Sequence, residues 1–216
     1  MAVSNSKKST ASKSKIRGLK LNFKKLNKGK ALTVSSVVLN VLLLIALLFS
    51  ISNPTSFTDA SSGYTVEIPA GWTRQDEFEV FRITKGGTDN PEARIYVYGQ
   101  RNATLGFYDS SKEDRDSILD QVTDQINQGQ NQFILSRFNL TDYSFTAKRG
   151  QKPDGTEYIQ THFTANDSDG QAVEGEHLLI ISKAGGIYSV VGYADANYWS
   201  QVSDQVAETM SSFTAP

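Results

Sequence analysis

An uncharged apolar run near the N-terminus constrains this chain more than any other feature of its sequence. Residues 31–52 (ALTVSSVVLNVLLLIALLFSIS) contain no acidic or basic side chain. As a helix rising about 1.5 Å per residue, the run covers roughly 33 Å, slightly more than a hydrocarbon core of about 30 Å. Its apolar residues occupy every side of such a helix, and a Lys-rich segment precedes it. These features predict a transmembrane helix over a helix buried in a soluble core.

Charge divides sharply between the two sides of this run. The first 30 residues carry ten Lys or Arg and no acid, and the first acidic residue is Asp59. The remaining 12 of the 22 basic residues accompany all 23 acidic ones, so residues 59–216 have a net charge of −11. The formal net charge of −1 is therefore the cancellation of two opposite halves. Because basic flanks stay inside, we expect a cytoplasmic N-terminus and an extracytoplasmic acidic domain.

Two other interpretations of the N-terminal segment stay open. A cleaved signal peptide would need a shorter basic leader and an apolar run of about 7 to 15 residues, and residues 50–52 (Ser-Ile-Ser) form only a poor cleavage site. An organellar transit peptide is likewise basic, Ser-rich and poor in acids. The length of the leader and of the apolar run favours an uncleaved signal anchor.

The basic leader, residues 1–30, has almost nothing to bury and is predicted to be disordered in water. Its lysines either attach to the anionic inner leaflet or only fix the orientation of the span. Phe23 is the one aromatic residue that could stack on a base, so we expect no nucleic-acid binding. Within the span, Asn40 is either a tolerated polar residue or a hydrogen-bonding contact that would support a homo-oligomer.

The residue types that most enzyme sites require are scarce in this chain. It contains no cysteine and two histidines, which excludes disulfides, thiolate zinc sites, iron–sulfur clusters and thiol nucleophiles. No G-x-S-x-G, H-E-x-x-H or phosphate-binding glycine loop occurs in it. We therefore predict no catalytic residue, no cofactor and no enzyme activity. A hydrolase that uses two carboxylates is the less favoured alternative.

A linker at 53–62 leads into one predicted domain at 63–216, which is long enough to form a real core. Alternating apolar and polar residues predict seven strands, at 64–68, 79–84, 94–100, 139–148, 156–165, 173–182 and 186–193. Links of hairpin length between most of them indicate an antiparallel sheet.

Two amphipathic helices interrupt and follow these strands. The first begins at a capping box on Ser110 or Ser111 and ends at Gly129. The second begins at Asp195 or Asn197 and carries apolar residues at helical spacing. These are Trp199, Val202, Val206, Met210 and Phe213. The order βββ-α-ββββ-α predicts an α+β fold, an antiparallel β-sheet flanked by helices.

The two ends of the domain resemble PsbP-like domains. Residues 63–72 (GYTVEIPAGW) are similar to the family's opening pattern Y-x-(I/V)-x-x-P-x-x-W. Residues 188–213 are similar to its closing strand, its Tyr-Ala step and its final helix, which ends in Ser-Phe. The resemblance spans residues 63–213 and implies an α/β/α sandwich that acts by binding. Extrinsic photosystem II subunits, a Ran-binding import factor and bacterial envelope proteins of unknown role share that fold, but the anchor and leader depart from the photosynthetic members.

These features predict a single-pass protein of the bacterial cell envelope whose extracytoplasmic PsbP-like domain docks an envelope protein or supports an envelope complex. The alternative is a carrier that holds a small apolar or glycan ligand between sheet and helix. In either case the expected ligand or partner surface consists of Tyr96, Tyr98, Phe107 and Tyr108.

Hairpin geometry brings the two histidines together. If residues 169–170 (Asp-Gly) form a two-residue turn, the numbers of paired residues sum to 339, and His162 lies opposite His177 with Cβ atoms about 5 Å apart. Such a pair could hold a metal or respond to pH near 6. A longer turn would shift the register by one residue.

The third ligand of such a site is missing. Glu176 is predicted to project from the opposite face, and Gln160 or Tyr158 would be weak ligands. We therefore predict no metal site, with His162 and His177 as the candidate pair to test.

Overall fold

The structure, a computed structural model, describes residues 54–77, 80–86, 92–104 and 106–216. The predicted leader (1–30) and transmembrane segment (31–52) lie outside these residues. Among the described residues, no helix combines the length and the apolar character needed to cross a bilayer.

Nine strands form within the described residues. They are β1 (Thr55–Thr58), β2 (Thr65–Ile68), β3 (Thr73–Glu77), β4 (Val80–Lys85), β5 (Ala93–Gln100), β6 (Thr141–Gln151), β7 (Glu157–Asn166), β8 (Ala172–Ile181) and β9 (Ile187–Asp195). The helical elements are the 3-10 turn η1 (Phe107–Asp109), α2 (Lys112–Asn127), α3 (Gln132–Phe138) and α4 (Ala196–Ser212).

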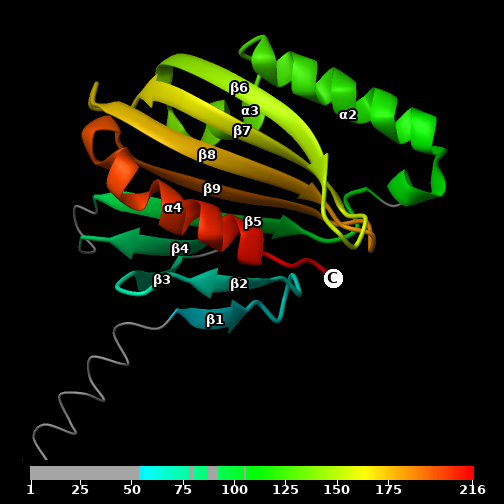
Figure 1. Ribbon diagram of the computed structural model, residues 1–216, viewed down its shortest axis with the longest axis horizontal. Coiled ribbons are helices and arrows are strands. Elements are labelled where there is room, and N and C mark those ends of the chain that lie inside the picture. The colour runs from blue at the N-terminus through cyan, green and yellow to red at the C-terminus, as the bar shows by residue number, and fades with distance from the viewer. Residues whose placement is uncertain (1–53, 78–79, 87–91, 105) are drawn as a thin grey trace, which may run out of the picture. The chain divides into compact units, whose positions relative to one another are not determined.

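Seven strands form one antiparallel sheet in the order β3-β4-β5-β9-β8-β7-β6, and β1 pairs with β2 in a separate hairpin. The chain leaves the middle of the sheet after β5, passes through α2 and α3 to the far edge at β6, and returns strand by strand until β9 pairs with β5. The helix α4 and the β1–β2 hairpin cover one face, and α2 and α3 cover the other (Figure 1). The predicted antiparallel α+β sheet with flanking helices is confirmed.

Each face of the sheet has its own core because alternate residues of a strand point to opposite sides. The α4-side core includes Val66, Ile83, Ile95, Val190, Val206 and Phe213. The α2-side core includes Leu119, Ile126, Ile134, Ile159, Phe163 and Val191. Fully burying an aliphatic or aromatic side chain of this size stabilises a fold by about 1.5–3 kcal/mol, so two such cores hold the sheet between the helices.

Local sequence signals explain how the two long helices begin and pack. Ser111 caps α2 by accepting a hydrogen bond from the Asp114 N–H at 3.1 Å, as the capping-box pattern predicted. On α4, Val202 and Val206 are fully buried. A Cβ atom at Gly192 on β9 would overlap Val206, so glycine at this position lets α4 approach the sheet closely.

Besides η1, three short elements were not predicted from the sequence. β1 lies within the predicted linker, where Phe57 stacks on Phe81 with ring centroids 4.2 Å apart. β3 (TRQDE) has no apolar residue, which is common for a strand at the edge of a sheet. α3 has only seven residues, too few to show a helical period, and its start depends on the Asn131 cap.

The predicted pairing of the two histidines is wrong. β7 and β8 are joined by a loop at 167–171 in which the Asp167 N–H donates to the Gln171 carbonyl at 2.9 Å, and the paired residue numbers sum to 338. His162 therefore pairs with Glu176, and His177 lies on the opposite face of the sheet. Glu176, predicted on the face away from His162, lies on the same face.

Candidate functional site

The α4-side face of the sheet is covered over only part of its width. On β8, Leu178 and Ile180 are buried in the α4-side core, whereas Glu174 and Glu176, earlier on the same face, are only half-buried. Farther from α4, the same face of β7 and β6 continues with polar side chains. We call this region the polar half-face; it consists of Thr146, Lys148, Gln160, His162, Glu174 and Glu176.

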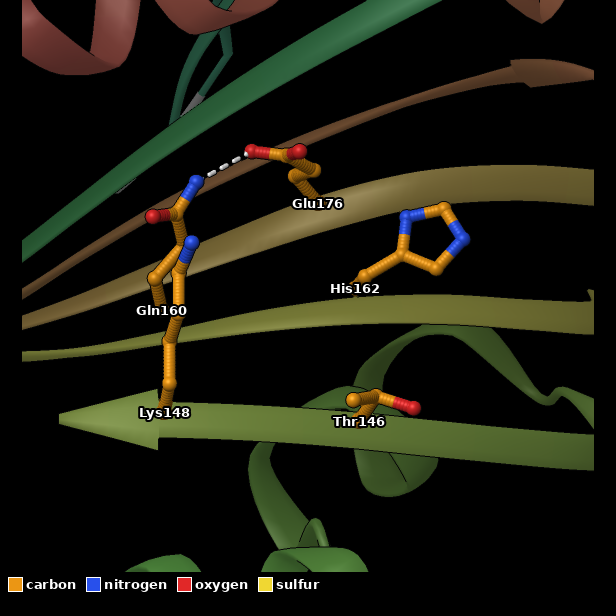
Figure 2. Close-up of a pocket in the computed structure, with 5 residues that line it drawn as sticks. All are labelled: Thr146, Lys148, Gln160, His162 and Glu176. Carbon is orange, nitrogen blue, oxygen red and sulfur yellow. Dashed lines mark hydrogen bonds between the residues drawn. The ribbon is translucent and has the colours of Figure 1, made fainter.

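A pocket of about 130 Å³ opens on the polar half-face. Its lining residues come from three adjacent strands: Thr146 and Lys148 from β6, Gln160 and His162 from β7, and Glu176 from β8 (Figure 2). The strand register creates this set, because paired residues of neighbouring antiparallel strands place their side chains on the same face.

Each carboxylate of the polar half-face has one diagonal contact on β7. Gln160 Nε2 donates to Glu176 Oε2 at 2.7 Å, and His162 Nε2 lies 3.5 Å from Glu174 Oε1. Such diagonal neighbours are within reach of long side chains in an antiparallel pair. Each contact uses one oxygen of its carboxylate.

Lys148 supplies the positive charge of the pocket. Its side chain is exposed and extends from β6 towards Gln160 (Figure 2). Within the described part of the chain, the Lys148 side chain forms no hydrogen bond or ion pair. The pocket therefore presents an unpaired ammonium group and a carboxylate that Gln160 already orients.

This pocket does not suit a metal ion or a large ligand. No three His, Asp or Glu side chains in the described ranges are close enough to share a metal ion. Pockets for drug-sized molecules usually have volumes of about 300–1,000 Å³, well above the 130 Å³ found here. The size of the pocket and the mixture of charges in it suit a small polar group.

A buried polar chain on the opposite face places Ser, His and Asn side chains in the order of a nucleophilic triad. His177 Nε2 lies 3.0 Å from Ser189 Oγ, and His177 Nδ1 lies 3.3 Å from Asn131 Nδ2. Asn131 Oδ1 accepts a hydrogen bond from the Ile134 N–H, which turns the NH2 group of the amide towards the ring. Nδ1 is therefore an acceptor, and Nε2 carries the proton and donates it to Ser189.

This tautomer is wrong for nucleophilic catalysis, in which the histidine must accept the proton of the serine hydroxyl. Substrate also has no access, because Asn131, His177 and Ser189 are at most 3% exposed. Burial lowers the pKa of His177 from 6.5 to about 3, so its ring is neutral at neutral pH. These hydrogen bonds are structural, because they join the start of α3 to the central strands β8 and β9.

Two acidic residues, Asp116 on α2 and Asp154 between β6 and β7, have structural hydrogen-bond partners. Asp116 accepts hydrogen bonds from Lys112 and Arg149, which lower the pKa of its carboxyl group. The Thr156 backbone N–H likewise lowers the pKa of Asp154. A carboxylic acid that protonates a leaving group needs the opposite shift.

The predicted surface residues Tyr96 and Tyr98 lie together on β5 under α3. The Tyr96 ring lies 5.2 Å from the Phe138 ring, and the Tyr98 ring lies 5.2 Å from the Phe133 ring, both measured between centroids. The Arg137 guanidinium stacks on Tyr98 at 4.5 Å. Side chains of α3 thus occupy the space next to the two tyrosines in which the carrier hypothesis placed a ligand.

The other two predicted surface residues, Phe107 and Tyr108, form η1 and pack edge to face with centroids 5.2 Å apart. The Tyr108 hydroxyl donates to the Ile181 carbonyl at 2.7 Å and accepts from the Glu157 N–H at 2.9 Å. Both contacts fasten η1 to the sheet. The pair is therefore a tertiary anchor for the segment between β5 and α2.

Comparison with known proteins finds similarity only among solved structures. No family model and no curated protein matches the chain. The solution structure of cyanobacterial PsbP (CyanoP) from Synechocystis sp. PCC 6803 aligns over 77% of this chain and 94% of that chain, with 14% identity and a TM-score of 0.49. The crystal structure of PA94, a Pseudomonas aeruginosa protein of unknown function, aligns over 76% of this chain and 97% of that chain, with 14% identity and a TM-score of 0.43. A PsbP structure is thus among those that resemble this chain, as its terminal motifs predicted, and neither likeness bears on partner, ligand or activity.

The polar half-face was not predicted as a site, although the sequence contains a signal for it. In residues 157–166, one set of alternate positions is Ile159, Thr161, Phe163 and Ala165, and the other is Tyr158, Gln160, His162 and Thr164. The first set is buried, and the second is half-buried or exposed. A strand with only one apolar face, placed inside a sheet that has helices on both sides, indicates that one of its faces is left uncovered.

Proposed function

We propose that this chain is a non-catalytic binding module that docks a protein partner through the polar half-face. The observation that supports this proposal is the uncovered part of the central sheet: α4 and the hairpin pack over one part of the face and leave Gln160, His162 and Glu176 beside them open. Polar side chains in ordered positions on a rigid sheet are a common basis for recognition.

The charge of the domain favours a partner with a basic surface. Residues 59–216 have a net charge of −11, and Glu174 and Glu176 lie side by side on the proposed docking face. Complementary charge speeds encounter and excludes partners of like sign. We therefore expect a basic protein surface to bind here and an anionic polymer to be repelled.

Site-specific photocrosslinking tests this docking. A photoreactive amino acid at Thr146 or Thr164 should give a crosslink to one and the same partner. Both residues are exposed on the uncovered part of this sheet face, which we call the open face. The same group at Gln121, exposed on α2, is the matched control. Glu174→Lys together with Glu176→Lys should abolish the crosslink from the open face. Equal crosslinking from Gln121, or a crosslink that survives the charge reversal, would contradict the proposal.

We further propose that residues 31–52 anchor the domain in a membrane, with the basic leader in the cytoplasm. The proposal depends on the apolar run and on the charge asymmetry across it. Since the chain has no cysteine, single cysteines give a clean test. In intact cells, an impermeant maleimide should label Ser168→Cys, which is exposed in the β7–β8 loop, and should not label Ser4→Cys. Labelling of Ser4→Cys from outside would overturn this topology.

A further inference from the structure

The pocket on the polar half-face contains two opposite charges that do not pair with each other. Lys148 and Glu176 both line it, and no ion pair joins them among the described residues. Lys148 lies on β6 and Glu176 on β8, and β7 runs between these two strands. Neighbouring strands are about 4.8 Å apart. A purely anionic ligand would meet the carboxylate, and a purely cationic ligand would meet the ammonium group.

We propose that this pocket binds a free α-amino acid by its zwitterionic head group. The ligand carboxylate contacts Lys148, and the ligand ammonium contacts Glu176. This arrangement neutralises both pocket charges with one small molecule, and each contact is a charge-assisted hydrogen bond. The ligand carboxylate neutralises the ammonium group of the protein, and the ligand ammonium group neutralises the carboxylate of the protein.

The remaining lining residues complete this recognition. Gln160 donates its amide N–H to one Glu176 oxygen, which fixes the carboxylate and leaves its other oxygen as an acceptor. His162, which also lines the pocket, lies 3.5 Å from Glu174. The ligand ammonium group therefore meets an oriented carboxylate oxygen, and the ligand carboxylate meets the Lys148 ammonium group.

The volume of the pocket limits the size of the ligand. At about 130 Å³, it holds the equivalent of roughly four water molecules of about 30 Å³ each. Glycine or alanine fits this space, and the side chain of a larger amino acid would extend over the open sheet. Because the pocket is open to solvent, we expect a dissociation constant on the order of 1 mM.

Ligand-detected saturation-transfer NMR on the full chain in detergent tests the proposal with glycine, L-alanine and D-alanine as probes. Glycine should bind saturably. Glycinamide, which lacks the carboxylate, and N-acetylglycine, which lacks the ammonium group, should each bind at least about tenfold more weakly. The dipeptide Gly-Gly carries both charges but holds them farther apart, so it tests whether the pocket recognises the head group of a free amino acid. It should bind more weakly than glycine.

Two conservative variants locate the binding. Lys148→Met and Glu176→Gln should each weaken glycine binding at least about tenfold. Lys183→Met and Glu208→Gln, which change exposed charges outside the pocket, should leave it unchanged. Absence of glycine binding at about ten times the expected dissociation constant, equal binding of the half-ligands, or equal effects of the control variants would overturn the proposal. This measurement uses no partner protein, so its failure would leave the docking proposal to be decided by crosslinking.

Discussion

Alternate residues of β7 lie in two different environments, although they share one strand. Ile159 and Phe163 are 1% exposed in the core under α2, whereas Gln160 and His162, on the other side, line an open pocket. The backbone and its neighbouring strands are the same for both sets. The difference therefore comes from what covers each face: α2 packs on one, and α4 stops short of the other.

The two histidines show the same contrast in their chemistry. His177, on the α2-side face, is 1% exposed and bonded on both ring nitrogens. The His162 side chain, on the open face, is 44% exposed and lies beside Glu174. A residue type that is rare in this chain thus has a structural position on one face and an accessible position on the other. Under the docking proposal, one side of β7 contributes to stability and the other side to recognition.

The largest expected effect comes from removing a core side chain on the covered face. Phe163→Ala should destabilise the protein by about 3–5 kcal/mol, because it removes a buried ring and leaves a cavity next to Phe145. Its neighbour Thr164, exposed on the open face, is the matched control, and Thr164→Ala should change stability by less than about 0.5 kcal/mol. Urea unfolding of the two variants measures the difference. Similar losses for both would show that the open face also contributes to the core.

The second effect is a dependence of stability on pH that the buried His177 causes. Burial lowers the pKa of His177 in the folded protein to about 3, while in the unfolded chain it has its ordinary value near 6.5. Below pH 6.5 the unfolded chain binds a proton that the folded chain does not. The His177 contribution is therefore complete above pH 6.5 and is lost as the pH falls, by about 1.4 kcal/mol per unit down to about pH 3.

Between pH 7 and pH 5, this group should cost the wild-type protein about 2 kcal/mol. His177→Gln lowers stability at pH 7 and removes this part of the pH dependence. Urea unfolding of the wild-type and variant proteins at the two pH values gives the comparison, and carboxylates common to both proteins cancel in it. A His177→Gln variant that kept the whole wild-type difference would contradict the prediction.

Periodicity was sufficient to predict the larger elements but not the faces they present. The row of apolar residues along α4 and the capping box of α2 depend on local spacing, and the structure has both. The β7–β8 register depends on the length of one loop. In that loop Asp167 Oδ1 accepts from the backbone N–H groups of residues 169 and 171, which stabilises five loop residues where the Asp-Gly pair predicted two.

The polar positions of β7 indicate an uncovered face, but the set of residues that meet on it could not be predicted, for the same reason. A shift of one residue moves every side chain of a strand to the other face, so the predicted register joined His162 to His177 and separated it from Glu176. How much of this face α4 covers also depends on tertiary structure, because the sequence of β7 does not show where α4 will end. Once the register is known, the polar positions of β6, β7 and β8 assemble without further assumptions.

The smallest effect concerns how α2 is held on the face that it covers. Asn127, near the end of α2, donates to the Ala147 carbonyl at 3.3 Å and accepts from the Ala147 N–H at 2.6 Å. Ala147 lies on β6, an edge strand, so the side-chain amide pairs with it as a neighbouring strand would. Asn127→Ala should cost about 1 kcal/mol, because both hydrogen bonds are exposed to water.

The same substitution should make β6 more prone to pair with a second chain, since free backbone groups on an edge strand are a template for association. Analytical ultracentrifugation of Asn127→Ala and wild-type chains, in the same detergent and over a range of concentrations, measures this. Lys112→Ala, which removes an exposed ion pair at the other end of α2, is the control and should not associate. If Asn127→Ala loses stability without associating, then α2 covers the core face without protecting the edge, and the two helical layers differ only in how much of the sheet they bury.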